Sequence, residues 1–330
     1  MRWPTAAPVN MIIDTHFSPI KLGATTPQYA ALSDFHLNPA VGCIYGCRHC
    51  FIPALYSKSQ ANVFSTVGVA DAEAEHGEYL IIRRKEEYAL LKSLERAEDD
   101  AWKQFNRHGI VILASTTDPY QKFPKPITSA FPQTQEVFDD IIERLLMLLF
   151  YKTGLRVRIL TRSPYVRRHF DFFREFGDRL QFGMSIPTLN EELSHLYEPG
   201  ATSPNERLKT MRAAKMAGLN CFVCMSPTYP ECDENDLRRT LRAVAELNPV
   251  TIFHEPINIR GRNLERLPEA SRAAMINWTG YALRQFQDVH CIASEFGIID
   301  RLHFLPDLTL READPQWFNY WRARRPPWPE

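Results

Sequence analysis

The sequence lacks both a net charge and a long hydrophobic run. It has 39 basic and 39 acidic residues, which argues against a uniformly basic surface for nucleic acid, although a local basic patch stays compatible with this balance. Even the apolar stretch Ile141–Tyr151 is interrupted by Glu143 and Arg144, so it does not predict a membrane span. Residues Met1–Ile13 carry too few apolar side chains for the core of a signal peptide. We therefore expect a cytoplasmic protein with no membrane partner.

The cysteines lack the even number that a disulfide framework needs. There are seven in 330 residues, and without a secretion signal they are expected to be reduced thiols. Three of them, Cys43, Cys47 and Cys50, are separated by three and then two residues. Gly42 directly precedes the first cysteine, and Gly46 directly precedes the second. The glycines allow the backbone to curl until the three sulfurs face one point. Three thiolates are an incomplete set for a closed zinc site or an all-cysteine cluster, so one coordination position stays open for a substrate or cofactor.

This C-x3-C-x2-C spacing, with Asn38 and Pro39 just upstream, resembles the signature of the radical S-adenosylmethionine (SAM) superfamily, and more narrowly its branch related to spore photoproduct lyase. The resemblance implies that the three cysteines hold a [4Fe-4S] cluster and that SAM chelates the fourth iron. It implies reductive cleavage of SAM to a 5'-deoxyadenosyl radical, with electrons from a low-potential donor such as flavodoxin or ferredoxin. His49 stands where the superfamily usually has a larger aromatic residue, and its imidazole is expected to pack on the adenine.

The pattern along the chain predicts an α/β fold. After a first strand near Asp34–Leu37, short apolar runs alternate with segments of helical period, which implies parallel strands joined by right-handed crossovers. A partial (β/α)6 TIM-like barrel accounts for six such pairs, and the resemblance implies the same fold. We expect an N-terminal arm at 1–33, the barrel at 34–300 and a C-terminal extension at 301–330. The predicted pairs of strand and helix are 79–82 with 85–107, 109–115 with 133–151, 155–160 with 165–176, 180–186 with 204–217, 220–225 with 234–247, and 250–253 with 268–286.

Polar residues follow the predicted strands one after another, where the loops of a barrel converge on one mouth. They include Thr117, Asp118, Arg162, Ser163 and Ser185. The resemblance implies that Thr117 and Asp118 lie near the amino group of SAM, that Arg162 meets its carboxylate, and that Ser185 meets the ribose or the carboxylate. A guanidinium suits a carboxylate because it forms two charge-assisted hydrogen bonds. Relatives often have Lys at the position of Arg162.

Further candidates lie on the last two barrel strands. Cys221 and Cys224 are three residues apart, so in a strand they point to opposite faces and do not share a metal. Cys224 is the better candidate for a catalytic thiol if it points inward. Cys232 lies eight residues further along the chain, and no role is assigned to it. His254 and Glu255 also alternate faces, so only one of this pair of acid/base candidates can point into the barrel.

Other conspicuous residues have simpler interpretations. Glu198 and Arg207 are expected to form a buried pair that braces a loop, next to the helix cap at Ser203. Cys291 is expected to lie in the core. The aromatic and basic tail 317–325 resembles a nucleic-acid surface in composition, but we expect it to be a helix that packs over the barrel.

The leading interpretation is a radical SAM enzyme that abstracts hydrogen from an unidentified substrate. One alternative is a binding module stabilised by zinc at Cys43, Cys47, Cys50 and a histidine, although His49 adjoins Cys50 and would strain to share the ion. Zinc as the only tightly bound metal would favour it. The other alternative is a non-catalytic homologue that keeps the cluster and binds SAM without cleaving it.

We predict that the protein does not repair thymine dimers by the photoproduct-lyase route. That family relies on a cysteine hydrogen donor close to the strand end that here reads Ala114-Ser115-Thr116-Thr117. The measurement is a repair assay on DNA that contains the thymine dimer, with reduced, reconstituted protein and SAM. Turnover of the dimer would show the prediction to be wrong.

Overall fold

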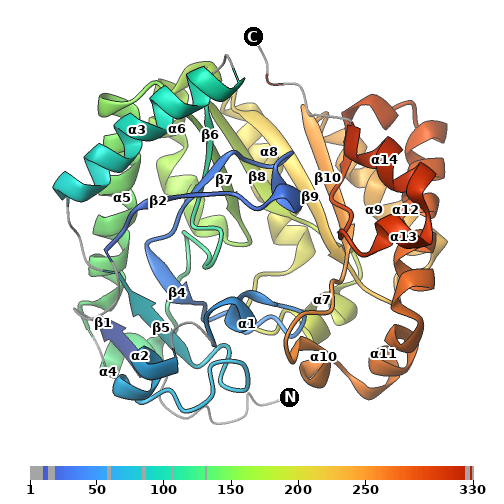
Figure 1. Cartoon of the computed structure of the whole chain (residues 1–330), viewed down its shortest axis with the longest axis horizontal. Coiled ribbons are helices and arrows are strands. Elements are labelled where there is room, and N and C mark those ends of the chain that lie inside the picture. Colours follow the sequence, from blue (N-terminus) through green and yellow to red (C-terminus); the bar gives the residue numbers. More distant parts are fainter. Residues whose placement is uncertain are drawn as a thin grey trace.

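The fold is that of a computed structural model, which describes residues 10–13, 19–57, 61–83, 87–105, 108–130, 132–323 and 328. Figure 1 shows a curved sheet in the middle of the molecule with helices around its outside. Among the described residues, no helix is both long enough and apolar enough to cross a membrane.

The main sheet forms the wall of a partial barrel. Its described strands follow the order β11-β10-β9-β8-β7-β6-β3-β2. Every neighbouring pair from β3 to β11 is parallel, whereas β2 joins β3 antiparallel. The carboxyl ends of the parallel strands therefore meet at one mouth. The bounds are β2 Leu22–Ala24, β3 Phe35–Leu37, β6 Ile110–Leu113, β7 Arg156–Thr161, β8 Leu180–Ser185, β9 Asn220–Thr228, β10 Thr251–Pro256 and β11 Leu302–Phe304.

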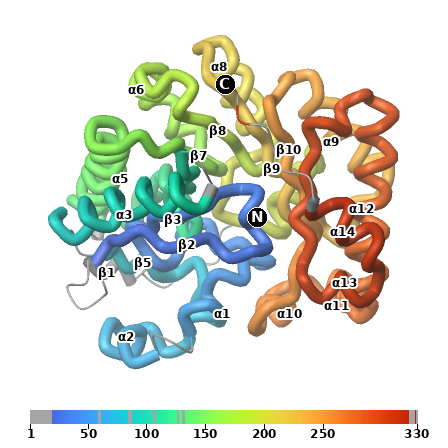
Figure 2. Tube along the Cα trace, turned by 45° about the horizontal axis from the view of Figure 1, so that its top comes forward, coloured from blue at the N-terminus to red at the C-terminus, as the bar shows by residue number. Residues whose placement is uncertain are grey.

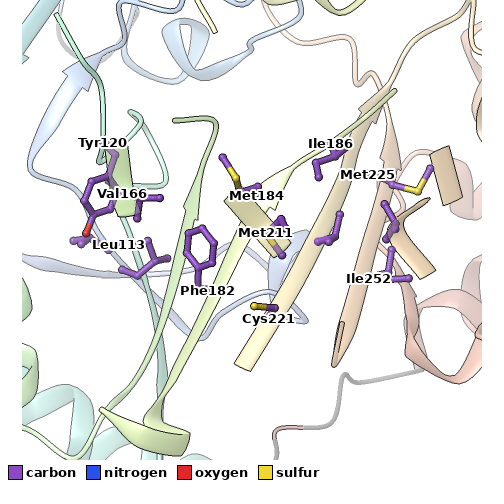
Figure 3. Packing of buried hydrophobic residues seen from close by; sticks show 14 of the residues in the cluster. Leu113, Tyr120, Val166, Phe182, Met184, Ile186, Met211, Cys221, Met225 and Ile252 are labelled. Atoms are coloured by element: carbon purple, nitrogen blue, oxygen red, sulfur yellow. The ribbon is translucent and has the colours of Figure 1, made fainter. Parts of the chain in front are cut away.

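The sheet is buried on both faces, as its continuous apolar runs predict. All residues of β6, β8 and β10 are buried. The outer face packs on the helices through a large apolar cluster that includes Phe182 and Ile252 and reaches Met211 of α8 (Figure 3). The inner face carries a smaller cluster, formed by Phe222, Cys224 and their neighbours.

The helices largely follow the predicted periods. The predicted helix 165–176 begins as a 3-10 turn at 164–169. The predicted helix 268–286 is divided because the Asn277 side chain accepts a hydrogen bond from Gly280 N and starts a new helix. The bounds are α1 Ile52–Ser57, α2 Ala61–Thr66, α3 Glu87–Phe105, α4 Lys125–Ala130, α5 Thr134–Lys152, α6 Phe170–Glu175, α7 Glu191–Tyr197, α8 Pro204–Met216, α9 Glu234–Glu246, α10 Asn263–Arg266, α11 Glu269–Ala274, α12 Trp278–Glu295, α13 Leu310–Ala313 and α14 Pro315–Ala323.

One predicted strand lies outside the barrel. Tyr79–Ile82 is a strand, β5, but it pairs with β1 (Asn10–Ile13) and β4 (Ala40–Gly42) in a separate three-stranded sheet. Its place as the first barrel strand was wrong, and β3 takes that position. The apolar run established a buried strand but not its partners. Five of the six predicted barrel strands are therefore confirmed as β6 to β10, and β3 replaces the sixth. β11 adds a seventh parallel strand that the pattern did not predict.

The segment Thr25–Ser33, called here the strap, connects β2 to β3 and reaches the other edge of the sheet. Gln28 Nε2 lies 3.5 Å from the carbonyl oxygen of Leu305, just beyond β11. On the inner face, Arg158 of β7 donates to the carbonyl oxygens of Ala31 and Leu32. The trace of this N-terminal region, drawn in blue, crosses in front of the barrel strands in Figure 2. Residues 1–9 and 14–18 of the expected arm lie outside the described part of the chain.

The C-terminal helix α14 packs against the barrel through its aromatic residues. Trp321 is fully buried, and its ring centroid lies 4.7 Å from that of Phe286 on α12 and 5.4 Å from that of Phe304 on β11. The aromatic part of the tail thus faces the interior, while residues 324 and 325 lie outside the described ranges. The expectation for Cys291 was wrong, since α12 turns this residue to the surface.

We expect Trp321→Ala to lower the free energy of unfolding by about 3–5 kcal/mol, because it removes a large side chain from a packed site. The matched control is Tyr320→Ala on the same helix, where the side chain is 43% exposed and the expected loss is about 1 kcal/mol. The measurement is urea denaturation of both variants. Equal losses would contradict the described docking of α14.

Candidate functional site

A cavity of about 350 Å³ lies inside the barrel at the mouth, within the size range of small-molecule sites. Cys43, Cys47 and Cys50 all line it. Residues from the ends of the barrel strands and from the strap form the rest of its wall. The cavity therefore brings together the cysteine motif and the polar strand ends that the sequence singled out.

The cysteine loop follows β4 and depends on two left-handed glycines. Gly42 has φ +92° and Gly46 has φ +55°, a conformation that residues with a Cβ rarely adopt. A Cβ on Gly42 would also collide with the carbonyl oxygen of Tyr79. The backbone turns at both glycines, and the three thiols line the cavity. That the three sulfurs face one point stays a prediction.

Hydrogen bonds from distant segments fix the backbone of this loop. Ile44 N donates to Gln121 Oε1 at 2.7 Å, and Gln121 also donates to Thr117 Oγ1 at 2.7 Å. Gly200 N donates to the carbonyl oxygen of Tyr45 at 3.0 Å. Gln121 is completely buried, so its side chain links the cysteine loop rigidly to the end of β6.

Two residues of α10 hold the other side of the loop. Asn263 Nδ2 donates to the carbonyl oxygen of His49 at 2.9 Å, and Arg266 donates to the carbonyl oxygens of Cys50 and Arg48. Sequence reasoning missed both, because no local pattern connects residues that are more than 200 positions apart.

The three thiols, as described, do not surround a single ion. Among the described residues, the three sulfurs do not form a set within 4.8 Å of one another, whereas sulfurs that share one tetrahedral zinc ion would be about 3.8 Å apart. Burial raises the pKa of Cys43 to about 12, with a further contribution from Asp118, and burial also raises the pKa of Cys47 and Cys50. The three thiols therefore need a positively charged partner before they can all become thiolates.

Glu198 forms the charged centre beside the loop. Its side chain is fully buried, and its carboxylate accepts from Arg162 Nε at 2.7 Å and pairs with Arg207 Nη1 at 2.6 Å. Burial opposes ionisation, but the two guanidinium groups outweigh it and lower the pKa of Glu198 to about 2. The predicted brace between Glu198 and Arg207 is confirmed, and Arg162 is a third member that the sequence did not reveal.

His49 lies next to this centre. Its Nε2 atom is 4.0 Å from Glu198 Oε1, and its ring centroid is 5.8 Å from that of Tyr229. Burial lowers the pKa of His49 to about 3, so the imidazole is neutral. Cys47, His49 and Glu198 have ligand atoms within 4.8 Å of one another. Glu198 is already shared by two arginines, however, so this trio is a poor zinc site.

Asp118 and Thr117 line the cavity at the end of β6. The Asp118 carboxylate accepts from Thr161 Oγ1 at 2.6 Å, from Arg162 N at 2.7 Å and from Tyr120 N at 2.9 Å. Burial raises the pKa of this carboxyl, in spite of these donors. Asp118 therefore ties β6 to β7 and also presents negative charge at the cavity wall.

The two predicted serines differ in position. Ser185 lines the cavity, and its hydroxyl donates to the carbonyl oxygen of Ser226 at 2.7 Å. Ser163 is buried and lies outside the cavity lining among the described residues. Its hydroxyl accepts from Tyr165 N at 3.2 Å and so caps the following 3-10 turn.

On β9 and β10, Cys221 and Cys224 point to opposite faces of the sheet, and so do His254 and Glu255, as predicted. Cys224 and Glu255 line the cavity, while Cys221 lies in the outer apolar cluster. His254 packs edge-on against Phe286 and Phe304 on the outer side of the sheet, with ring centroids 5.3 Å and 5.7 Å away. His254 is therefore not placed to act on a substrate. Cys232 is also in the outer cluster.

Glu255 is the centre of a second polar group in the cavity. Its carboxylate accepts from Ser226 Oγ at 2.8 Å and from Asn258 Nδ2 at 3.1 Å. The hydroxyl of Tyr29, from the strap, lies beside this group, 3.5 Å from Asn258 Nδ2. Burial raises the pKa of Glu255 to about 7. Sequence reasoning missed Tyr29, because only the fold brings the strap to the end of β10.

Comparison with known proteins agrees with this geometry. A family model described as the radical SAM superfamily matches residues 37–244. Uncharacterized protein ORF301 of Acidianus two-tailed virus is 29% identical over 241 residues, which cover 71% of this chain and 71% of that protein. Uncharacterized protein Rv2578c of Mycobacterium tuberculosis is 24% identical over 242 residues, which cover 71% of this chain and 62% of that protein.

Solved structures share the fold at low sequence identity. Spore photoproduct lyase complexed with dinucleoside spore photoproduct aligns with a TM-score of 0.58 and 13% identity, over 90% of this chain and 81% of that one. Streptococcus suis SuiB bound to S-adenosylmethionine aligns with a TM-score of 0.51 and 13% identity, over 84% of this chain and 51% of that one. At this identity the likeness concerns the fold alone.

We predict that Glu198→Gln lowers the free energy of unfolding at pH 7 by about 3–5 kcal/mol, because it leaves two guanidinium groups buried without a counter-charge. A carboxyl with a lowered pKa stabilises the fold above its unfolded value, 4.5, and loses this contribution as the pH falls toward 2. The difference between wild type and variant should therefore shrink from pH 5 to pH 2. Denaturant titrations at several pH values measure it.

The control is Glu192→Gln, which removes an exposed carboxylate from α7. It should change stability little at any pH. A Glu198→Gln variant as stable as this control at pH 7 would contradict the described charge centre.

Proposed function

Because the chain belongs to the radical SAM superfamily, we propose that Cys43, Cys47 and Cys50 hold a [4Fe-4S] cluster with one iron open to SAM. The observation that carries this proposal is the loop itself. Its three thiols come from one glycine-dependent turn and open onto one cavity. The chain is an enzyme of the radical SAM class.

When bound, the cluster and SAM supply reductive cleavage of the sulfonium to methionine and a 5'-deoxyadenosyl radical. The protein has to bind both groups, keep water out and present the substrate. The buried loop and its hydrogen bonds from β6, the α7–α8 connection and α10 serve the first two tasks.

Arg162 is the proposed partner of the SAM carboxylate. Its guanidinium is anchored through Nε by Glu198, and its side chain is 20% exposed where it lines the cavity. Among the described hydrogen bonds, the terminal nitrogens remain for a ligand, and they form the edge that binds a carboxylate in two places. Glu198 therefore acts as a positioning residue for Arg162.

The remaining SAM contacts are proposed for residues that line the same cavity. Asp118, with Thr117 beside it, offers negative charge to the amino group. Ser185 offers a hydroxyl at the end of β8 to the ribose or the carboxylate. His49 is neutral, lies beside the Tyr229 ring and lines the cavity, which suits contact with the adenine. Ser163 is left out of the proposed site, since it caps a turn instead.

The substrate would occupy the part of the cavity lined by Cys224 and Glu255. We propose that the reaction is abstraction of a hydrogen atom from this substrate and differs from thymine-dimer repair. Thr116 stands at the relevant strand end, where its hydroxyl donates to the carbonyl oxygen of Ala40 at 3.0 Å. A low-potential protein such as flavodoxin or ferredoxin is the proposed electron donor.

The test is anaerobic reconstitution with iron and sulfide, followed by metal analysis and detection of 5'-deoxyadenosine on reduction with SAM. We expect about four irons per chain and release of 5'-deoxyadenosine. Cys43→Ala, Cys47→Ala and Cys50→Ala should each lose most of the iron and at least about a hundredfold of the cleavage rate, because the open cluster has no spare thiol.

Cys291→Ala is the matched control, since this thiol is exposed on α12 and away from the cavity lining. It should keep the iron content and the cleavage rate of the wild type. A wild-type protein that binds only zinc, or that binds SAM without cleaving it, would overturn the proposed chemistry.

A further inference from the structure

Two buried glutamates at the site differ in the charge of their surroundings, and of the two only Glu255 lines the cavity. Glu198 is paired with two guanidinium groups. Glu255 is only 8% exposed, yet the side chains that donate to it, Ser226 and Asn258, are neutral. Among the described residues, Glu255 has no ion pair within 4.0 Å.

The cation that acts on Glu255, Arg260, forms its ion pair with another carboxylate. Arg260 lines the same cavity and has only a minor effect on Glu255. It forms an ion pair with Asp307 at 2.8 Å and donates to Gln28 of the strap. Its guanidinium also lies 5.2 Å from the centre of the Phe51 ring. Arg260 is thus engaged by Asp307, Gln28 and Phe51, and among the described ion pairs none joins it to Glu255.

A buried carboxylate without a counter-charge is unfavourable unless a ligand supplies one. The Glu198 carboxylate, by contrast, has two arginines as counter-charges. At Glu255 the corresponding space is cavity, not protein. The missing positive charge is therefore expected on the bound molecule.

The wall beside Glu255 is apolar and aromatic. The Tyr29 and Phe51 rings are stacked, with centroids 6.3 Å apart and planes 11° apart. Cys224 lies with Phe222 and Phe253 in the inner cluster, and burial, with a contribution from Glu255, raises the pKa of this thiol to about 12. It stays a neutral S–H at physiological pH. This end of the cavity thus suits an apolar or planar body that carries one charged group.

We propose that Glu255 is the substrate-binding carboxylate of this site and takes a substrate through a cationic nitrogen, with Tyr29 and Asn258 positioning the carboxylate. The inference rests on the proposed function, because it assigns the substrate class of the same cavity. It does not require SAM cleavage for its test.

The test uses benzylammonium as the probe, with benzyl alcohol and benzoate as neutral and anionic comparisons of similar shape. Binding to the full-length protein is measured by calorimetry, before and after anaerobic reconstitution. We expect benzylammonium to bind at least about tenfold more tightly than either comparison at pH 8, because only it pairs with the carboxylate. Glu255→Gln should remove this preference, while the exposed control Glu192→Gln should keep it.

The pH dependence supplies a second readout that needs no variant. With a pKa of about 7 for Glu255, the ionised fraction rises about tenfold from pH 6 to pH 8, and the affinity for benzylammonium should rise with it. The other groups around Glu255 do not change charge in this interval. The pKa of Tyr29 is raised far above it by burial, that of Cys224 is about 12, and that of Asp307 is lowered by its hydrogen bonds in spite of burial. The remaining charged neighbour is Arg260, which pairs with Asp307.

Tight binding of benzyl alcohol or benzoate, or equal binding of benzylammonium by Glu255→Gln and wild type, would overturn the inference. If the Glu255→Gln variant does not fold, the wild type alone decides. An affinity for benzylammonium that stays constant between pH 6 and pH 8 would then overturn the inference. Absence of iron and of 5'-deoxyadenosine with the benzylammonium preference intact would overturn the proposed function and leave this inference standing.

Discussion

The buried carboxylate of Glu198 is the interaction on which the cofactor end of the cavity depends. It joins Arg162 at the end of β7 to Arg207 on α8, so two elements of the barrel and the loop after α7 share one charge centre. Removing the carboxylate would leave two guanidinium groups facing each other in the interior. The same residue thus stabilises the fold and orients the group proposed to bind SAM.

The cysteine loop is also held by residues from distant parts of the chain. Its sequence supplies the curl through Gly42 and Gly46, but its position comes from Gln121 and from the residues of α10. A loop that presents three thiols to one cluster must not move, because each sulfur has to stay at bonding distance. Rigid hydrogen bonds from both sides of the barrel meet this requirement.

Sequence reasoning predicted the features that are local or periodic. The motif, the parallel strands and the opposite faces of Cys221 and Cys224 follow from spacing alone. It did not predict that Tyr79–Ile82 joins a separate sheet, that Arg162 shares Glu198, or that Tyr29 reaches Glu255. Each of these depends on contacts between segments far apart in the chain, and a single sequence carries no information about such partners. The exposed position of Cys291 was missed because its apolar neighbours concealed the helical period.

The two ends of the cavity are built from different parts of the chain. The loop after β4 carries the cysteines, and polar ends of the barrel strands form the wall beside it. The other end takes Tyr29 from the strap, which crosses the opening. Under the proposed function, substitutions in the strap would change the wall that faces the substrate and leave the residues proposed to hold iron in place. The strap is then the part of the site that can vary with least effect on the cofactor end.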